Sequence, residues 1–308
     1  MTTTKTLSTL AGMHRDNVAP GKLIENRTVY ASDLAELSVY DTYESAKRVL
    51  LEADELLYCG MMTGRKIMHG KGGYSTEFLP HESFVIAPNS FVEIDFPDAT
   101  QDTPTTCMTL EIPRETLKKL TDQFNLQQAM PKELGEWAPQ VNQMHLAHTE
   151  ATQQLLERIV HSFVCKEDDR DLVLTFGVNE LIARMLRHES RTFLLNCVSE
   201  DPTKSGLTQA VAHIEANLAR PLDVDGLARL ACMSRSKLYS QFRNTLGCSP
   251  VEFQQRRRLE KACSMIRSGV QSITAVSYDL GFSNPSHFSR RFHQMYGMTP
   301  REFAARFH

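Results

Sequence analysis

The stretch SHFSRRFHQMYGMTPREF (residues 286–303) decides the fold of the C-terminal third, because a stretch fifty positions upstream has the same skeleton. The earlier stretch reads SKLYSQFRNTLGCSPVEF (236–253). At this offset the apolar residues, the glycine and the following Ser/Thr-Pro pair coincide. The matched pairs are Leu230 and Leu280, Leu238 and Phe288, Phe242 and Phe292, Leu246 and Tyr296, and Gly247 and Gly297. One supersecondary unit is therefore present twice.

Each copy predicts a helix, a short turn and a second helix. Ser234 precedes the second helix of the first copy and Asn284 that of the second, and both residue types cap helix N-termini. The glycine that follows each second helix is typical of a helix C-terminus. We therefore expect second helices over 235–246 and 285–296, within a region that is almost entirely helical from residue 207 onward.

A helix-turn-helix motif places its second helix in the major groove of DNA, where the N-terminal residues of that helix meet base edges. The helical period directs one set of side chains of each second helix into the core, namely Leu238 and Phe242 in the first copy and Phe288 and Phe292 in the second. The outward positions carry hydrogen-bond donors and acceptors suited to bases and phosphates. These outward residues are Ser236, Lys237, Tyr239 and Ser240 in the first copy and Ser286, His287, Arg290 and Arg291 in the second.

The separation of the two copies fits the pitch of DNA. The helix expected between them, over 250–268, has about 19 residues and therefore spans about 29 Å. Successive major-groove segments on one side of B-DNA lie about 34 Å apart. A rigid helix of this length lets one chain place both second helices in consecutive turns of the duplex.

The net charge of −3 conceals two halves of opposite sign. From Ser205 onward the chain has 14 Lys and Arg residues against 7 Asp and Glu, whereas 1–204 has 20 against 30. Such an asymmetry indicates two modules, of which the basic one favours a polyanion. The polar stretch SEDPTKSG (199–206) lies where the balance changes and is the expected linker.

The N-terminal part predicts a β-rich domain. Short apolar runs separated by Gly, Pro, Asn and Asp extend from about 28 to 112 and are typical of a sandwich or barrel. Amphipathic helices follow up to about 198, including a pair over 149–165 and 170–188. The polar start, 1–27, reads as a mobile arm without a signal peptide. The expected fold class is α+β, with two domains covering 28–198 and 207–308.

Residues 207–308 resemble the DNA-binding domain of the AraC/XylS family of bacterial transcription regulators. The second copy, ITAVSYDLGFSNPSHFSRRFHQMYGMTPREF (273–303), carries the signature of that family. The resemblance implies a sequence-specific DNA-binding regulator rather than an enzyme. It assigns base reading to Ser236, Tyr239, Ser240, Ser286, His287 and Arg290, and phosphate contacts to Arg235, Lys237, Arg243 and Arg291.

The N-terminal part resembles the effector and dimerisation domains of the same family, which are cupin-like barrels followed by helices. The run GRKIMHGKGGYSTEFLPHESFVIAPNSFVEIDFPDA (64–99) carries this resemblance. It implies a homodimer through helices in about 149–188, a small-molecule effector in the barrel and, for an activator, RNA polymerase as a further partner. Packing of these helices beside the barrel of the same chain is the open alternative to the dimer. The polar strand residues chosen for the effector pocket are Arg65, His69 and Tyr74, with an outer-face location as the open alternative.

Several other functions are disfavoured by the sequence. No run approaches the roughly 18–20 apolar residues that cross a bilayer. The seven cysteines are scattered without a C-x-x-C pair, which favours reduced thiols in a cytoplasmic protein, with a redox pair as the minor alternative. The histidines lack the paired spacing of a cupin metal site, so no metal or other cofactor is expected. A cupin-type enzyme fused to a DNA-binding module is the weakest alternative, and a regulator whose N-terminal domain binds no ligand stays open.

Overall fold

The computed structural model describes residues 6–17, 20–31, 35–70, 73, 75–127, 131–134, 144–165, 168–201 and 203–307. The chain divides into two compact units. Unit 1 comprises Met1–Leu120 and Gln140–Ala183, and unit 2 comprises Thr121–Pro139 and Arg184–His308. The first is rich in strands and the second is helical, which confirms the predicted α+β class.

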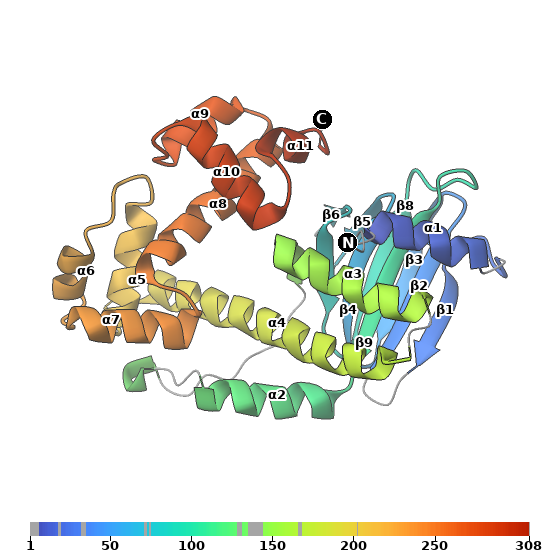
Figure 1. Ribbon diagram of the computed structural model, residues 1–308, viewed down its shortest axis with the longest axis horizontal. Coiled ribbons are helices and arrows are strands. Elements are labelled where there is room, and N and C mark those ends of the chain that lie inside the picture. Colours follow the sequence, from blue (N-terminus) through green and yellow to red (C-terminus); the bar gives the residue numbers. More distant parts are fainter. Residues whose placement is uncertain are drawn as a thin grey trace. The chain divides into compact units, whose positions relative to one another are not determined.

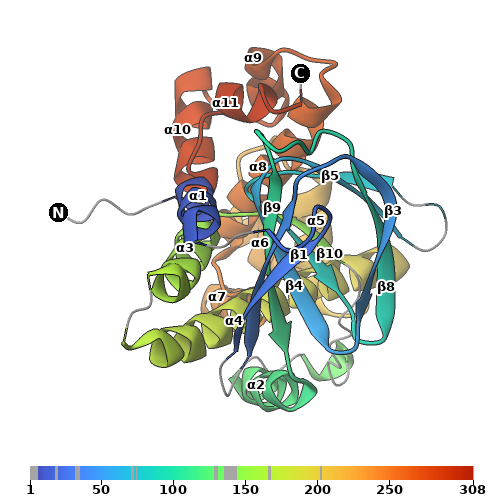
Figure 2. The same ribbon diagram turned by 90° about the vertical axis from the view of Figure 1, so that its right-hand side faces the viewer.

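Unit 1 contains two antiparallel sheets (Figure 2). One has the order β1-β2-β9-β4-β7-β10 and the other the order β3-β8-β5-β6. The strands are β1 (Asn26–Ala31), β2 (Glu36–Thr42), β3 (Ala46–Ala53), β4 (Leu56–Thr63), β5 (Lys66–His69), β6 (Ser75–Phe78), β7 (Glu82–Ile86), β8 (Ser90–Phe96), β9 (Thr105–Ile112) and β10 (Met144–Ala147).

The core of unit 1 is formed by inward side chains of both sheets, including Phe78, Phe84 and Phe96. Successive residues of a strand face opposite sides, so only every second residue reaches this core. In β5 the buried positions are Lys66 and Met68. The interior is therefore apolar except where a polar residue, such as Lys66, occupies an inward-facing position of a strand.

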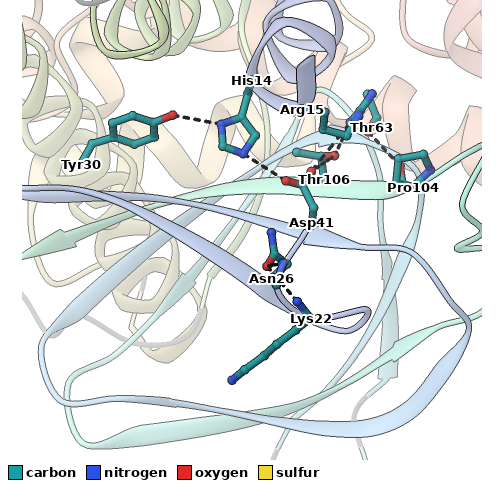
Figure 3. A network of polar contacts seen from close by, with 10 residues as sticks. His14, Arg15, Lys22, Asn26, Tyr30, Asp41, Thr63, Pro104 and Thr106 are labelled. Carbon is teal, nitrogen blue, oxygen red and sulfur yellow. Dashed lines mark hydrogen bonds and ion pairs between the residues drawn. The ribbon is translucent and has the colours of Figure 1, made fainter. Parts of the chain in front are cut away.

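The N-terminal segment is not a mobile arm over its described part. Residues Leu7–Asn17 form helix α1, which lies beside α3 (Glu150–Val164), and its Leu7 and Leu10 are buried. His14 adds a polar anchor because its Nε2 lies 3.1 Å from Asp41 Oδ2 and its Nδ1 lies 3.0 Å from the hydroxyl of Tyr30 (Figure 3). The expectation of a mobile arm missed this helix because its apolar residues are few and isolated.

Two helices complete the predicted pair. Helix α3 begins at the N-cap Thr149, whose side chain accepts a hydrogen bond from the backbone N–H of Thr152. Helix α4 (Arg170–Glu200) starts where expected but continues well beyond residue 188. Its Gly177 packs under α3, because a Cβ there would stand 2.6 Å from Ile159 Cγ1.

Unit 2 contains the C-terminal helices (Figure 1). No helix within the described residues is long and apolar enough to cross a membrane. Helix α2 (Arg114–Gln127) and the 3-10 turn η2 (Lys132–Leu134) precede β10 in the chain. The later helices are α5 (Gly206–Ala216), α6 (Val224–Leu230), α7 (Arg235–Gln241), the π-helical turn η3 (Phe242–Leu246), α8 (Pro250–Ser268), α9 (Ile273–Asp279), α10 (Pro285–Tyr296) and α11 (Pro300–Ala304).

Each copy of the repeat has its own apolar core. The first motif, α6 and α7 with η3, packs with α5 around Leu238 and Phe242. The second motif, α9 and α10, packs around Phe288 and Phe292 together with Leu259 of α8. The two sets of buried side chains are separate clusters. The repeat read from the sequence is therefore also a repeat of packing.

The two motifs differ by one residue in their turns. Before the turn, Ala231 N–H bonds Leu227 O and Leu280 N–H bonds Val276 O, which is an offset of 49. The second helices begin at Arg235 and Pro285, which is an offset of 50. The pairing of Leu230 with Leu280 was therefore wrong: Ala231 is the structural equivalent of Leu280, and Leu230 is 42% exposed.

Candidate functional site

The second helices of both motifs are anchored by aromatic and leucine side chains. Leu238, Phe242, Phe288 and Phe292 are fully buried, as their helical spacing predicts. The Ser234 side chain accepts from Lys237 N–H, and Asn284 Oδ1 accepts from His287 N–H at 2.8 Å. These caps fix where each helix starts, and so which residues stand at its exposed N-terminal end.

The predicted contacts of the first motif share the outward face of α7. Ser236, Lys237 and Ser240 are exposed, and Tyr239 is half-buried. Arg235 Nη1 lies 3.3 Å from Asp225 Oδ1, and its guanidinium carbon stands 6.0 Å from the centre of the Tyr239 ring. Both side chains of the Arg235–Asp225 pair are more than half exposed, so this ion pair is weak and can open for a phosphate.

The predicted contacts of the second motif lie on α10. Ser286 and Arg290 are exposed, whereas the half-buried His287 packs its ring against Phe282, with 5.8 Å between ring centroids. Arg291 Nη1 donates to Gln294 Oε1 at 2.9 Å and is partly covered. Arg290 therefore has the freer guanidinium for a bidentate contact with a guanine edge.

Helix α8 joins the motifs with the predicted bounds and 19 residues. Ser249 and Glu252 form a capping box at its start, and Gly269 ends it in the left-handed conformation with φ of 65°. Good caps at both ends keep the helix continuous. The rise of an α-helix gives it a length of about 29 Å.

The three arginines 256–258 of α8 have three different environments. Arg256 is exposed, Arg257 forms ion pairs with Glu215 and Glu260, and Arg258 is only 5% exposed. Burial lowers the pKa of Arg258 from its usual range. Arg258 is therefore neither placed for a DNA contact nor part of a solvated face.

Of the residues chosen for the effector pocket, neither of the two described ones, Arg65 and His69, is buried in the barrel interior. Arg65 is half-buried, and its guanidinium pairs with Glu77 and Asp98. His69 is in the outward phase of β5, with Nε2 at 3.0 Å from Asp95 Oδ2. Tyr74 lies outside the described residues. The error is one of strand phase: a shift of one residue exchanges the two faces of a strand.

Lys66 is a buried polar residue of the described part of the barrel that was not among the candidates predicted from the sequence. Its side chain is 3% exposed, and Nζ lies 3.2 Å from Glu25 Oε1, 2.9 Å from Cys107 Sγ and 4.8 Å from the centre of the Phe96 ring. The alternation of buried and half-buried residues along β5 identifies it, since Lys66 shares the phase of Met68. A buried ammonium is a candidate anchor for an anionic group.

The thiols and histidines do not assemble a reactive or metal site within the described part of the chain. The six described cysteines are free, and burial raises the pKa of Cys59 and Cys107, which keeps both as unreactive thiols. Among the described residues no group of three or more His, Cys, Asp or Glu side chains could hold a metal ion.

Two family models match this chain. Residues 33–193 match the AraC-type transcriptional regulator N-terminus, and residues 227–306 match a helix-turn-helix domain. The second range begins within α6 and includes the rest of the first motif and the whole second motif. The first range covers most of unit 1 and more than half of the whole chain.

Curated relatives match over part of their length. The HTH-type transcriptional regulator ArgR of Pseudomonas aeruginosa is 38% identical over 96 residues, 31% of this chain and 29% of ArgR. The HTH-type transcriptional activator RhaS of Shigella boydii is 26% identical over 177 residues, 58% of this chain and 62% of RhaS. This chain thus spans less than two thirds of either relative.

Among solved structures, ToxT of Vibrio cholerae is 13% identical, with a TM-score of 0.40 over 89% of this chain and 98% of ToxT. The family models, whose matched ranges cover most of the β-rich unit and most of the helix-turn-helix region, carry the assignment. The chain belongs to the family of AraC-type transcriptional regulators.

Proposed function

We propose that this protein is a sequence-specific DNA-binding transcription regulator that reads two consecutive major-groove segments. The observation that carries the proposal is the duplicated second helix: α7 and α10 bury the same apolar stripe and expose polar residues at equivalent N-terminal positions. A continuous 19-residue helix between them matches one turn of DNA. The positive balance from Ser205 onward supports binding to a polyanion.

The test is a selection of duplexes from a random pool by the full chain, followed by titrations on the selected site. We expect two conserved segments about 10–11 base pairs apart, centre to centre. Scrambling either segment is expected to lower affinity by at least about tenfold, because each segment carries its own base contacts. Recovery of one segment alone, or of none above background, would remove the two-segment proposal.

For the barrel, the proposed effector is a small anionic molecule that reaches Lys66 in place of Glu25. Support comes from the location of this ion pair on the inward side of β5. Binding of candidate carboxylic acids by calorimetry to the full chain, compared with Lys66→Met, tests the assignment. Equal binding by both proteins would contradict the role of Lys66.

A regulator whose N-terminal domain only dimerises is the second candidate. Leu172 and Phe176, one helical turn apart on α4, are 57% and 69% exposed, which favours an interface on this helix. We propose a homodimer through α3 and α4. Sedimentation of wild type and of Leu172→Ser/Phe176→Ser tests it: a dimer is expected to become a monomer, whereas a wild-type monomer would exclude the interface.

The remaining assignments follow from this function. We place the protein in the cytoplasm, where promoter DNA is, and assign it no enzymatic activity. The name of RhaS supports activation, for which RNA polymerase is the proposed partner. A reporter gene placed behind the selected site distinguishes activation from repression.

A further inference from the structure

The junction between the two DNA-reading motifs is polar. The first core ends on α8 at Phe253 and the second begins at Leu259, and between them Gln254 and Arg258 are buried. Gln254 Nε2 donates to Arg220 O at 2.9 Å, which ties α8 to the loop after α5. Apolar packing therefore holds each motif to α8, but the direct connection between the motifs depends on hydrogen bonds.

Arg258 makes that connection. Its Nε donates to Leu218 O at 2.5 Å and its Nη2 donates to Arg220 O at 2.9 Å, both in the loop after α5. Its Nη1 donates to Gly281 O at 3.2 Å, in the turn of the second motif. The guanidinium carbon also stands 5.8 Å from the centre of the Phe282 ring. One planar cation thus bonds carbonyls of the loop that leads into the first motif and a carbonyl in the turn of the second motif.

The backbones at this junction are in close contact. Gly281 has φ of +75°, and a Cβ on it would overlap the carbonyl oxygen of Ala219. Ala219 lies between the two residues whose carbonyls Arg258 binds on the first-motif side. The carbonyls follow the C-terminal ends of α5 and α9, where helix dipoles favour a cation.

We infer that Arg258 is a positioning residue that sets the orientation of one reading helix relative to the other, and so the spacing of the two DNA segments. This inference rests on the proposed two-segment function. Arg258 is buried and does not touch DNA itself. Its hydrogen bonds hold the loop 217–220 against the turn at Gly281. Without them, side-chain packing on α8 alone would set the orientation of these two segments relative to each other.

Arg257 is the matched control. It is adjacent on α8, has the same side chain and forms strong ion pairs, with Nε at 2.7 Å from Glu215 Oε1 and Nη1 at 2.7 Å from Glu260 Oε2. These contacts lie on α5 and α8 and do not include the second motif. Arg257→Met therefore removes comparable polar contacts without touching the connection to Gly281.

The experiment uses the full chain and the duplex selected by the wild type. Affinity is measured for native spacing, for spacings altered by one or two base pairs, and for duplexes with one segment scrambled. One base pair shifts the second segment by about 3.4 Å and turns it by about 34°. If α7 and α10 are held rigidly relative to each other, this change lowers affinity, because both helices must bind their segments at the same time.

For Arg258→Met we expect native-spacing affinity to fall by about tenfold, affinity for one-segment duplexes to be unchanged, and the penalty for altered spacing to shrink to less than about threefold. Arg257→Met is expected to keep the wild-type spacing profile. An unchanged profile in a folded Arg258→Met protein would overturn the inference, since a purely structural role changes stability only.

Two further outcomes are separable. If the wild type binds one-segment duplexes as tightly as the full site, the two-segment function itself fails. If Arg258→Met does not fold by circular dichroism, Arg258→Lys is measured in the same series. Lysine keeps the charge but cannot bond all three carbonyls with fixed geometry, so a flattened profile supports the inference and a wild-type profile overturns it.

Discussion

Ser83 Oγ and His148 Nε2 lie 2.5 Å apart, with both side chains buried in unit 1. Ser83 also donates to the Tyr58 hydroxyl at 2.5 Å. On its other side the imidazole Nδ1 faces Gln153 Oε1 at 2.7 Å, and Gln153 Nε2 donates to Glu157 Oε1 at 3.0 Å. This chain of contacts links β4 and β7 to α3. The protonation state of His148 therefore affects the stability of unit 1 as a whole.

Acidification is expected to destabilise the protein through His148. Burial lowers its pKa from 6.5 to about 4, so between these values the unfolded chain binds more protons than the folded one. Stability therefore falls as pH drops through this window, by up to about 1.4 kcal/mol per pH unit. Thermal melts of wild type and His148→Gln from pH 7.5 to 4.5 measure it.

The difference between these two proteins isolates the one histidine, because every other titrating group is shared. The stability gap between them is expected to narrow as the pH falls. A gap that stays constant with pH would show that His148 does not titrate differently on folding.

Glu189 is expected to show the opposite pH dependence. Its carboxylate oxygens have no hydrogen-bond partner among the described residues, and burial raises its pKa from 4.5 to about 7. The protonated form is favoured in the folded state, so stability is lost as pH rises from about 4.5 to 7. Glu189→Gln is expected to raise the melting temperature at pH 8 and leave it nearly unchanged at pH 5.

The neighbour His188 provides the control for Glu189. Its pKa is lowered to about 4 by burial, so its contribution to stability falls with acidification. His188→Gln therefore removes a pH dependence of the other sign. If Glu189→Gln shows the same effect at both pH values, the burial of its charge is not what matters.

Arg290 and Arg291 are expected to act differently on DNA. Arg290→Ala should weaken the selected site by about 1–3 kcal/mol and relax one base preference, as loss of a bidentate guanine contact does. Arg291→Ala should weaken all duplexes alike and reduce the slope of log affinity against log salt by about one. Fluorescence anisotropy across a salt series on selected and scrambled duplexes separates these two patterns.

Two glycines of unit 2 offer a test of the close contact between the motifs. Gly247 and Gly281 have φ of +70° and +75°, so alanine carries the same backbone strain of about 1–2 kcal/mol at either site. At Gly247 the three atoms nearest to the added Cβ all belong to the Arg187 guanidinium, the nearest 2.8 Å away, at the end of a flexible side chain. At Gly281 it meets the backbone of Ala219.

Gly281→Ala is therefore expected to cost several kcal/mol and Gly247→Ala about 1–2 kcal/mol, measured by urea unfolding. Similar losses at the two sites would mean that the loop 217–220 moves aside easily. That result would also weaken the proposed rigidity of the junction.

The helical C-terminal third was predictable because the signals that begin and end its helices are local in the sequence. N-caps at Ser234 and Asn284 and stops at Gly247 and Gly269 fixed the ends of helices to the residue. The one-residue difference between the turns was missed because a single offset of 50 aligns the N-caps and apolar residues of both copies in the sequence. Hydrogen bonds such as that of Ala231 N–H to Leu227 O reveal it.

The β-rich unit was predicted only as a class. Strand phase decides which side chains enter the interior, and a short strand such as β5 carries too few residues for the phase to be read. Lys66 was overlooked because a lysine on a strand is usually exposed. Arg258 was equally hidden within a basic run, since its carbonyl partners at Leu218 and Gly281 lie far from it in the sequence.

The separate cores of the two motifs have an evolutionary consequence. Because the side chains around Phe242 and those around Phe292 belong to different clusters, substitutions in one core leave the packing of the other unchanged. The exposed residues of α7 can then be substituted so that this helix prefers other bases, while α10 keeps its original base preference. A lineage of such proteins can exchange its target promoters half a site at a time, retaining partial occupancy at every step.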